Sequence, residues 1–164
     1  MIELITRLQA QYPNLRFRHG DQFCWSPETS EIFYKPDAEG EQAVWSLLHE
    51  TGHALLRHQN YTADFELLRM EVEAWERARR LAQDVGITID DDHIEDCLDT
   101  YRDWLHKRSI CPTCGTKCLQ QDDGQHYRCF NCHSVWQVSS DRFARAYRRQ
   151  KQSEPVFNLT SNME

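Results

Sequence analysis

Two histidines and a glutamate in the segment "LLHETGHALLRH" have the spacing of a metal-dependent hydrolytic site. On a helix, His49 and His53 lie four residues apart on one face, so both imidazoles can reach a single metal ion. Glu50 is offset around that helix, where its carboxylate can act on a water molecule without binding the metal. The segment therefore predicts a zinc site with His49 and His53 as ligands and Glu50 as general base.

The alternative interpretation is an amphipathic helix that happens to carry two histidines. Gly52 argues against it, because a glycine inside a helix costs about 1 kcal/mol relative to alanine. A purely structural helix would not need that cost. The motif still requires a third protein ligand before it describes a catalytic zinc site.

The third ligand is expected on the helix that follows. His58 lies five residues beyond His53, about 140° around a continuous helix, so we expect it not to bind the metal. In "LLRMEVEAWERARRLA", a helical wheel places Glu71 near the middle of the apolar face and Glu73 on a side shared with arginines. A lone ionised carboxylate on an apolar face is costly to bury, and a metal ion would remove that cost. Glu71 is therefore the expected third ligand, with Glu73 as the alternative.

These two segments resemble the ImmA/IrrE family of small zinc metallopeptidases over residues 30–85. "HETGHALLRH" is followed by "EVEAW", and Glu71, Ala74 and Ala78 match the family's second motif, E-x-x-A-x-x-x-A. The resemblance implies a gluzincin-like site in which Glu71 completes the zinc ligands. It also implies an α+β fold with a minimal zincin-like core, made of a small antiparallel sheet, an active-site helix and following helices.

Apolar periodicity and turn residues predict the elements that position these side chains. Helices are expected over 2–12, from Asp37 as N-cap to residue 58, over 62–85 before Gly86, and over 91–107. "LRFRHGDQFCWS" and "EIFYK" are expected to be strands, and "EIFYK" could be a sheet edge that pairs with an extended peptide. Tyr34, Tyr61 and His58 are candidates to stabilise an oxyanion by their type and nearness in sequence, but a structural or surface role is the expected one for each.

Four cysteines form a second metal motif, C-x2-C-x14-C-x2-C. Its members are Cys111, Cys114, Cys129 and Cys132. Two such pairs can close a tetrahedral structural zinc site, and the intervening residues predict a hairpin with its turn at Asp123 and Gly124. Cys118, His126 and His133 are alternative ligands. So short a zinc ribbon is expected to need its metal in order to fold.

The charges are divided unevenly along the chain. Residues 1–100 carry 9 Lys and Arg against 20 Asp and Glu, whereas residues 101–164 carry 10 against 6. We expect a metallopeptidase core over 1–108, the zinc ribbon over 109–138, a basic helix over 139–151 and a flexible tail over 152–164. The acidic first part argues against nonspecific DNA binding there, and the basic helix is a candidate contact for nucleic acid.

Together these features predict a zinc-dependent endopeptidase that binds two zinc ions, one catalytic and one structural. Its expected substrate is an intracellular protein, and the family resemblance implies a regulatory protein such as a repressor, recruited through the ribbon. The alternatives are a ribbon protein that binds nucleic acid or protein and has an inactive H-E-x-x-H site, and a SprT-like protease acting on DNA-bound proteins. No apolar run is long enough for a membrane helix, and the N-terminus lacks the apolar core of a signal peptide, so a cytoplasmic location is expected.

Overall fold

A computed structural model describes residues 1–138 and, for the backbone alone, 148–150. The chain is mixed α and β and divides into two compact units, residues 1–102 and 103–164. The division between Arg102 and Asp103 falls inside a helix. No helix among the described residues combines the length and apolar character that crossing a bilayer requires.

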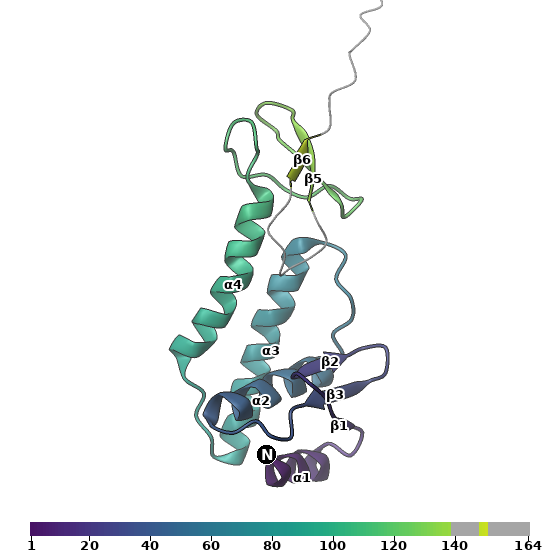
Figure 1. Ribbon diagram of the computed structural model, residues 1–164, viewed down its shortest axis with the longest axis vertical. Helices are drawn as coiled ribbons and strands as arrows, with labels where there is room; N and C mark the ends of the chain where they lie inside the picture. The colour runs from purple at the N-terminus through teal and green to yellow at the C-terminus, as the bar shows by residue number, and fades with distance from the viewer. Residues whose placement is uncertain (139–147, 151–164) are drawn as a thin grey trace, which may run out of the picture. The chain divides into compact units, whose positions relative to one another are not determined.

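The sheet of unit 1 has three short strands in the order β1-β3-β2 (Figure 1). β1 (Phe17–His19) pairs parallel with β3 (Glu31–Tyr34), and β2 (Cys24–Ser26) pairs antiparallel with β3. The expectation of an antiparallel sheet is therefore wrong for one of the two strand pairs. The link between β1 and β2 crosses the end of β3, and a Cβ on Gly20 would lie only 3.1 Å from the Phe33 Cβ. This crossing places β1 and β2 on opposite edges of β3.

The core of unit 1 lies between this sheet and its helices. α1 (Ile2–Gln11) contributes Leu4, Ile5 and Leu8, all buried. α2 (Glu41–Leu56) crosses α3 (Asp64–Val85) (Figure 1). Buried residues of both helices join the same cluster as Ile32 of β3. The first turns of α4 (Asp91–Ser109) add Ile94 and Leu98.

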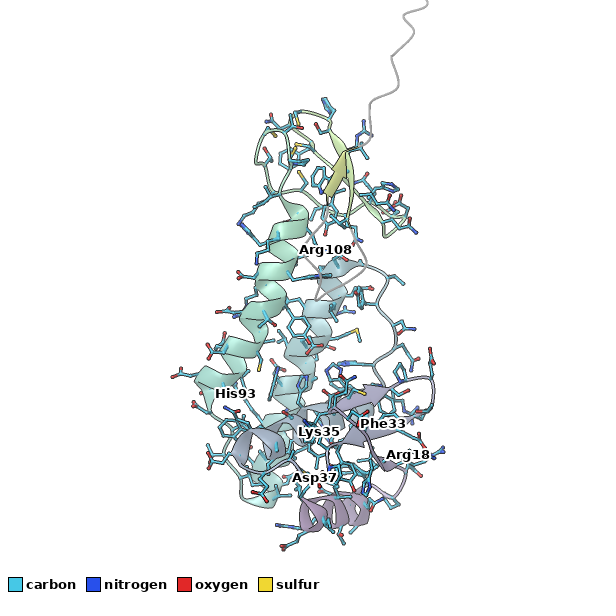
Figure 2. The ribbon with its side chains drawn as sticks, viewed as in Figure 1. Arg18, Phe33, Lys35, Asp37, His93 and Arg108 are labelled. Atoms are coloured by element: carbon cyan, nitrogen blue, oxygen red, sulfur yellow. The ribbon has the colours of Figure 1, made fainter. Side chains whose placement is uncertain are left out.

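Both ends of the active-site helix predicted from the sequence need correction. The N-cap is Gly40, with φ +87°, and Asp37 lies in the loop before α2 (Figure 2). Position 40 has a positive φ, which glycine adopts readily. An aspartate N-cap would instead need an extended backbone with negative φ. At the other end, α2 stops at Leu56, and Arg57 adopts the left-handed conformation. α3 starts two residues later than predicted and ends at Val85. Gly86 follows it with a φ of +75°, as expected of the C-cap.

Unit 2 is a small β-structure with its own core. β4 (His126–Arg128), β5 (Val135–Val138) and β6 (Arg148–Gln150) form an antiparallel sheet in that order. The rings of Tyr127 and Trp136 stack with centroids 5.5 Å apart, and the Trp136 indole donates to the Arg108 carbonyl at 3.0 Å. The turn at Asp123 and Gly124 precedes β4, as the sequence predicts.

The basic helix expected over 139–151 differs at its end, because residues 148–150 are extended and pair with β5. Pairing with an exposed strand edge satisfies their backbone groups, as a helix would have done. Residues 139–147, and the tail expected over 152–164, lie outside the described residues.

The closest approach between α2 and α3 is at Gly52. A Cβ on this residue would lie 2.6 Å from the Ala74 carbonyl oxygen, a backbone atom. The glycine thus has a packing role, which corrects the expectation that a structural helix would not need it. Since Glu71 lies one turn before Ala74, this close approach also sets the distance between Glu71 and α2.

We expect Gly52→Ala to lower the free energy of unfolding by about 1–3 kcal/mol, because the added methyl forces two backbones apart. Urea denaturation followed by circular dichroism measures the change. Gln42→Ala, at an exposed position of the same helix, is the control and should change stability by no more than about 0.5 kcal/mol. Alanine is the better helix former, so a more stable Gly52→Ala variant would contradict the close contact.

Candidate functional site

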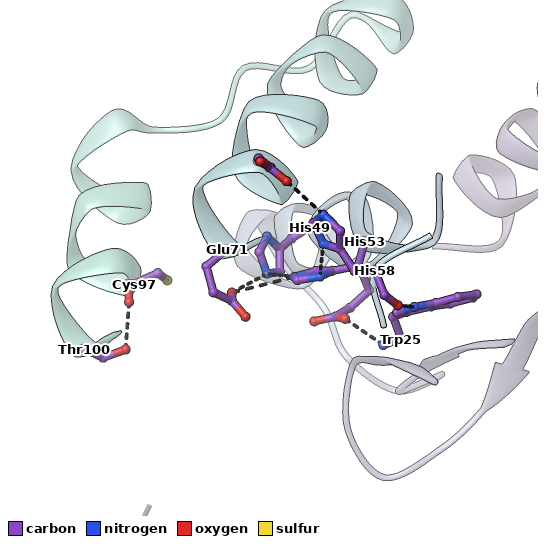
Figure 3. A network of polar contacts seen from close by, with 9 residues as sticks. Trp25, His49, His53, His58, Glu71, Cys97 and Thr100 are labelled. Carbon is purple, nitrogen blue, oxygen red and sulfur yellow. Dashed lines mark hydrogen bonds and ion pairs between the residues drawn. The ribbon is translucent and has the colours of Figure 1, made fainter. Parts of the chain in front are cut away.

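Two imidazoles and a carboxylate meet where α2 crosses α3 (Figure 3). His49 Nε2 lies 3.1 Å from His53 Nε2 and 3.1 Å from Glu71 Oε2, and His53 Nε2 lies 3.7 Å from the same oxygen. All three residues are buried. Bonds of about 2.0–2.1 Å to a tetrahedral zinc ion would place ligand atoms about 3.3 Å apart. The three atoms therefore fit around one metal ion, and they could hold one.

Glu71 is an anion in spite of its burial. Burial alone would raise the pKa of Glu71, but hydrogen bonds to His49 and His53, together with their charge, lower it well below its usual range. An ionised carboxylate is the form that binds a metal ion. The expected third-ligand position on α3 is thus occupied by a charged oxygen that faces both histidines.

The Glu50 side chain extends from α2, and its carboxylate is held by a residue of strand β2. Its Oε2 accepts a hydrogen bond of 2.7 Å from the backbone N–H of Trp25 on β2. The other oxygen, Oε1, has no hydrogen-bond partner in the part of the chain that the structure describes. The carboxylate is thus oriented through one oxygen and keeps the second for another partner, such as water.

Trp25 was not identified from the sequence as a site residue. Its backbone N–H contacts Glu50, and its indole N–H donates to the His58 carbonyl at 2.8 Å. Both contacts depend on β2 lying against α2, and no local pattern in the sequence reports that packing. The burial of Cys24, together with the charge of Glu50, raises the pKa of the Cys24 thiol, which therefore stays neutral.

Glu73, the alternative third ligand, does not join the metal-facing group. Its Oε2 lies 3.3 Å from His58 Nε2, and its Oε1 lies 3.8 Å from Arg69 Nε. His58 is buried, and its Nδ1 lies 2.9 Å from Nδ1 of His53. His58 therefore contacts His53 through the ring nitrogen that faces away from the metal position, and His58 does not face that position itself. Burial lowers the pKa of His58, the charge of His53 adds to this, and Glu73 opposes it.

The His49 ring is held by an aromatic contact. It stacks on Trp75, with centroids 4.1 Å apart and planes 29° apart. Its Nδ1 is buried and has no hydrogen-bond partner among the described residues. The two histidines are thus supported differently, His53 through its Nδ1 and His49 through the face of its ring.

Of the candidates for an oxyanion donor, His58 contacts Nδ1 of His53 and does not face the metal position. Tyr34 is buried in the core and its ring contacts His19 edge to face. Tyr61 lies in the loop between α2 and α3. β3 is the central strand of its sheet, so the "EIFYK" segment is not an edge, and the edge nearest Glu50 is β2.

The four cysteines of unit 2 form a second group that could hold a metal ion. Cys111 and Cys132 have sulfurs 3.5 Å apart, as do Cys114 and Cys129, and all four sulfurs lie within 4.8 Å of one another. These separations are too long for disulfides and suit zinc–sulfur bonds of about 2.3 Å. The four thiols therefore suit a closed tetrahedral site.

Each cysteine pair lies in a similar tight turn. The N–H of Gly115 donates to the Cys111 carbonyl and that of His133 to the Cys129 carbonyl, both at 3.0 Å. Gly115 and His133 both have positive φ, so His133 takes the backbone position that Gly115 takes in the first turn. Hydrogen bonds from the hydroxyl and backbone of Thr116 lower the pKa of Cys114 to about 5, which favours the metal-binding thiolate.

The alternative ligands are placed elsewhere. The Cys118 thiol is buried in the core of unit 2 and donates to the Thr116 carbonyl at 3.2 Å. His126 Nδ1 lies 2.6 Å from Asp123 Oδ2 in the hairpin turn. Neither residue belongs to the group of four sulfurs.

Comparison with known proteins adds no relative: no family model matches the chain, and neither a characterised protein nor a solved structure matches it. The chemistry of the site therefore has to be argued from the residues and their geometry.

We expect Glu71→Gln to reduce the bound metal from two ions per chain to one, because a neutral amide replaces the only anionic ligand of the unit 1 group. Metal analysis of dialysed protein gives the stoichiometry. Glu76→Gln, an exposed carboxylate on the same helix, should retain both ions. Two ions in Glu71→Gln would show that Glu71 is not a ligand.

Proposed function

We propose that the chain is a zinc-dependent endopeptidase with a gluzincin-like site, in which Glu50 is the general base and His49, His53 and Glu71 hold the zinc ion. The position of Glu50 carries the proposal. A site that only stabilises a fold has no use for a carboxylate that is oriented by a backbone N–H and whose other oxygen has no partner among the described residues. The resemblance of residues 30–85 to the ImmA/IrrE family, and with it a zincin-like core, agrees with this assignment.

A bound zinc ion would supply a Lewis acid that polarises a peptide carbonyl and lowers the pKa of water. Glu50 Oε1 would accept a proton from that water as the nucleophile forms. The N–H of Trp25 would hold Glu50 Oε2 throughout, so that the carboxylate needs no reorientation. Glu50 would then return the proton to the leaving amine, as a general acid does in the second half of the reaction.

An extended peptide is the substrate form that best suits the neighbouring sheet. β2 is an outer strand, and Trp25 on it contacts Glu50 directly. A peptide that paired with this edge would run past the Glu50 carboxylate, with its main chain held by strand-like hydrogen bonds to edge groups of β2 other than the Trp25 N–H, which stays on Glu50. We propose an unstructured or unfolded segment of an intracellular protein, such as a regulatory protein, as the substrate.

The cysteine group is proposed to be a structural zinc ribbon that recruits the substrate or a partner. Four sulfurs leave no position for water, so this site is not catalytic. Leu119 and Phe130 are exposed apolar side chains of unit 2, at 83% and 73%, and are suited to contact another protein.

The SprT-like alternative is less well supported, because that class uses a third histidine where this chain has Glu71. Binding of nucleic acid by residues 139–151 would depend on side chains outside the described part of the chain.

We expect Glu50→Gln to reduce peptidase activity by about 10²–10⁴-fold while both zinc ions stay bound, because the amide cannot accept the proton. Release of fluorescent peptides from a labelled unfolded protein measures activity, and metal analysis checks zinc. Glu41→Gln, an exposed residue on the same helix, is the control with unchanged activity. Full activity in Glu50→Gln would leave the chain as a binding protein with an inactive metal site.

A further inference from the structure

A line of polar contacts leads from His53 toward the surface. His53 faces His49 and Glu71 with Nε2, and its other ring nitrogen, Nδ1, lies 2.9 Å from His58 Nδ1. His58 Nε2 lies 3.3 Å from Glu73 Oε2. The His58 side chain is only 8% exposed, whereas that of Glu73 is 46% exposed. The line therefore connects a buried ligand with a half-exposed carboxylate, and Figure 3 shows His53 and His58 side by side within it.

The direction of each hydrogen bond in this line follows from a metal ion at His53 Nε2. A neutral imidazole carries one proton, so metal binding at Nε2 leaves that proton on Nδ1, which must donate. His58 Nδ1 must then accept, and this puts the proton of a neutral His58 on Nε2. That N–H points at Glu73, whose ionised carboxylate accepts. Every group in the line is left with one compatible role.

The end of α2 brings His58 into this place. The His58 N–H donates to the His53 carbonyl and the Arg57 N–H to the Ala54 carbonyl, both at 3.1 Å, which is the Schellman pattern of helix ends. Arg57 has φ +55°, where glycine is the usual residue. Because the chain turns back here, His58 lies beside His53 instead of about 140° around the helix. The Trp25 indole holds the turn by donating to the His58 carbonyl at 2.8 Å.

We propose that His58 and Glu73 are positioning residues that fix the tautomer and ring orientation of His53 for metal binding. The proposal rests on the function proposed above in requiring a metal ion at His49, His53 and Glu71. An imidazole that donates its second N–H is a better oriented and more basic ligand, and loss of such a partner typically weakens metal binding about 10–100-fold. His49 has no such hydrogen bond within the described residues, so His53 is the ligand whose affinity depends on one.

The test is titration of the metal-free full chain with Co²⁺, whose spectrum distinguishes four sulfurs from two imidazoles and a carboxylate. We expect His58→Phe to raise the dissociation constant of the histidine site about 10–100-fold and to leave the cysteine site unchanged. His58→Asn should recover most of the affinity, because its side-chain oxygen can accept from His53 Nδ1. His19→Phe, a change of an exposed histidine on β1, is the control and should bind as the wild type does.

Glu73→Ala keeps the test decisive if His58→Phe does not fold, because Glu73 is half exposed and its loss leaves the core intact. We expect it to weaken Co²⁺ binding in the same direction by about 10-fold. Nitrogen-15 NMR of the histidine rings adds a readout that packing alone would not change. The zinc-bound wild type should carry the His53 proton on Nδ1 and the His58 proton on Nε2.

Three outcomes would overturn the proposal. Two of them would leave the proposed metallopeptidase function intact, and the third would contradict it as well. Wild-type affinity in both His58→Phe and Glu73→Ala would remove the positioning role alone, as would a His58 proton on Nδ1 in the zinc-bound protein. If the wild type bound no Co²⁺ at the histidine site, the metallopeptidase function would fall as well. Peptidase activity is not needed for any of these readouts, so an inactive protein with weakened Co²⁺ binding in the variants would still support the positioning role.

Discussion

The close contact of α2 with α3 is the constraint on which the candidate site depends. Only a hydrogen atom at Gly52 lets the Ala74 carbonyl approach to within 2.6 Å of where a Cβ would stand. His49 precedes Gly52 by three residues, and Glu71 precedes Ala74 by three, so the helix contact and the ligand contact are one turn apart on both helices. A wider helix separation would draw the carboxylate away from the imidazoles and leave it buried without a partner, which is costly.

The spacing of residues in the sequence predicted the contacts that form within one or two turns of a helix. It did not predict the contacts that form where the chain turns back. The group of His49, His53 and Glu71 could be anticipated because a helix wheel fixes which side chains share a face. The same wheel kept His58 out of the ligand group, where the structure also leaves it, but it could not predict the contact of His58 with His53, because α2 ends at Leu56. Trp25 could not be found at all, because its role arises from a strand packed on a helix. The parallel pair of β1 and β3 was missed for a related reason: the crossing at Gly20 is a tertiary feature.

The two groups that could hold a metal differ in the number and type of their donors. Four sulfurs in paired turns complete a tetrahedron, and each turn supplies backbone N–H groups to sulfur, as from Thr113 to Cys111 at 3.4 Å and from Cys132 to Cys129 at 3.4 Å. Two imidazoles and one carboxylate leave a fourth position. The first arrangement suits a unit whose core is small, because metal binding adds folding free energy that a few apolar side chains cannot supply.

Trp25 couples two features of unit 1 that would otherwise be independent. Its backbone N–H orients Glu50, and its indole N–H holds the backbone of His58, which contacts His53. A shift of β2 relative to α2 would therefore disturb the Glu50 carboxylate and the support of a candidate ligand together. Since β2 is also an outer strand, a peptide that paired with it would act on the strand that holds both. In the proposed peptidase, peptide binding and the orientation of Glu50 would in this way be linked through Trp25.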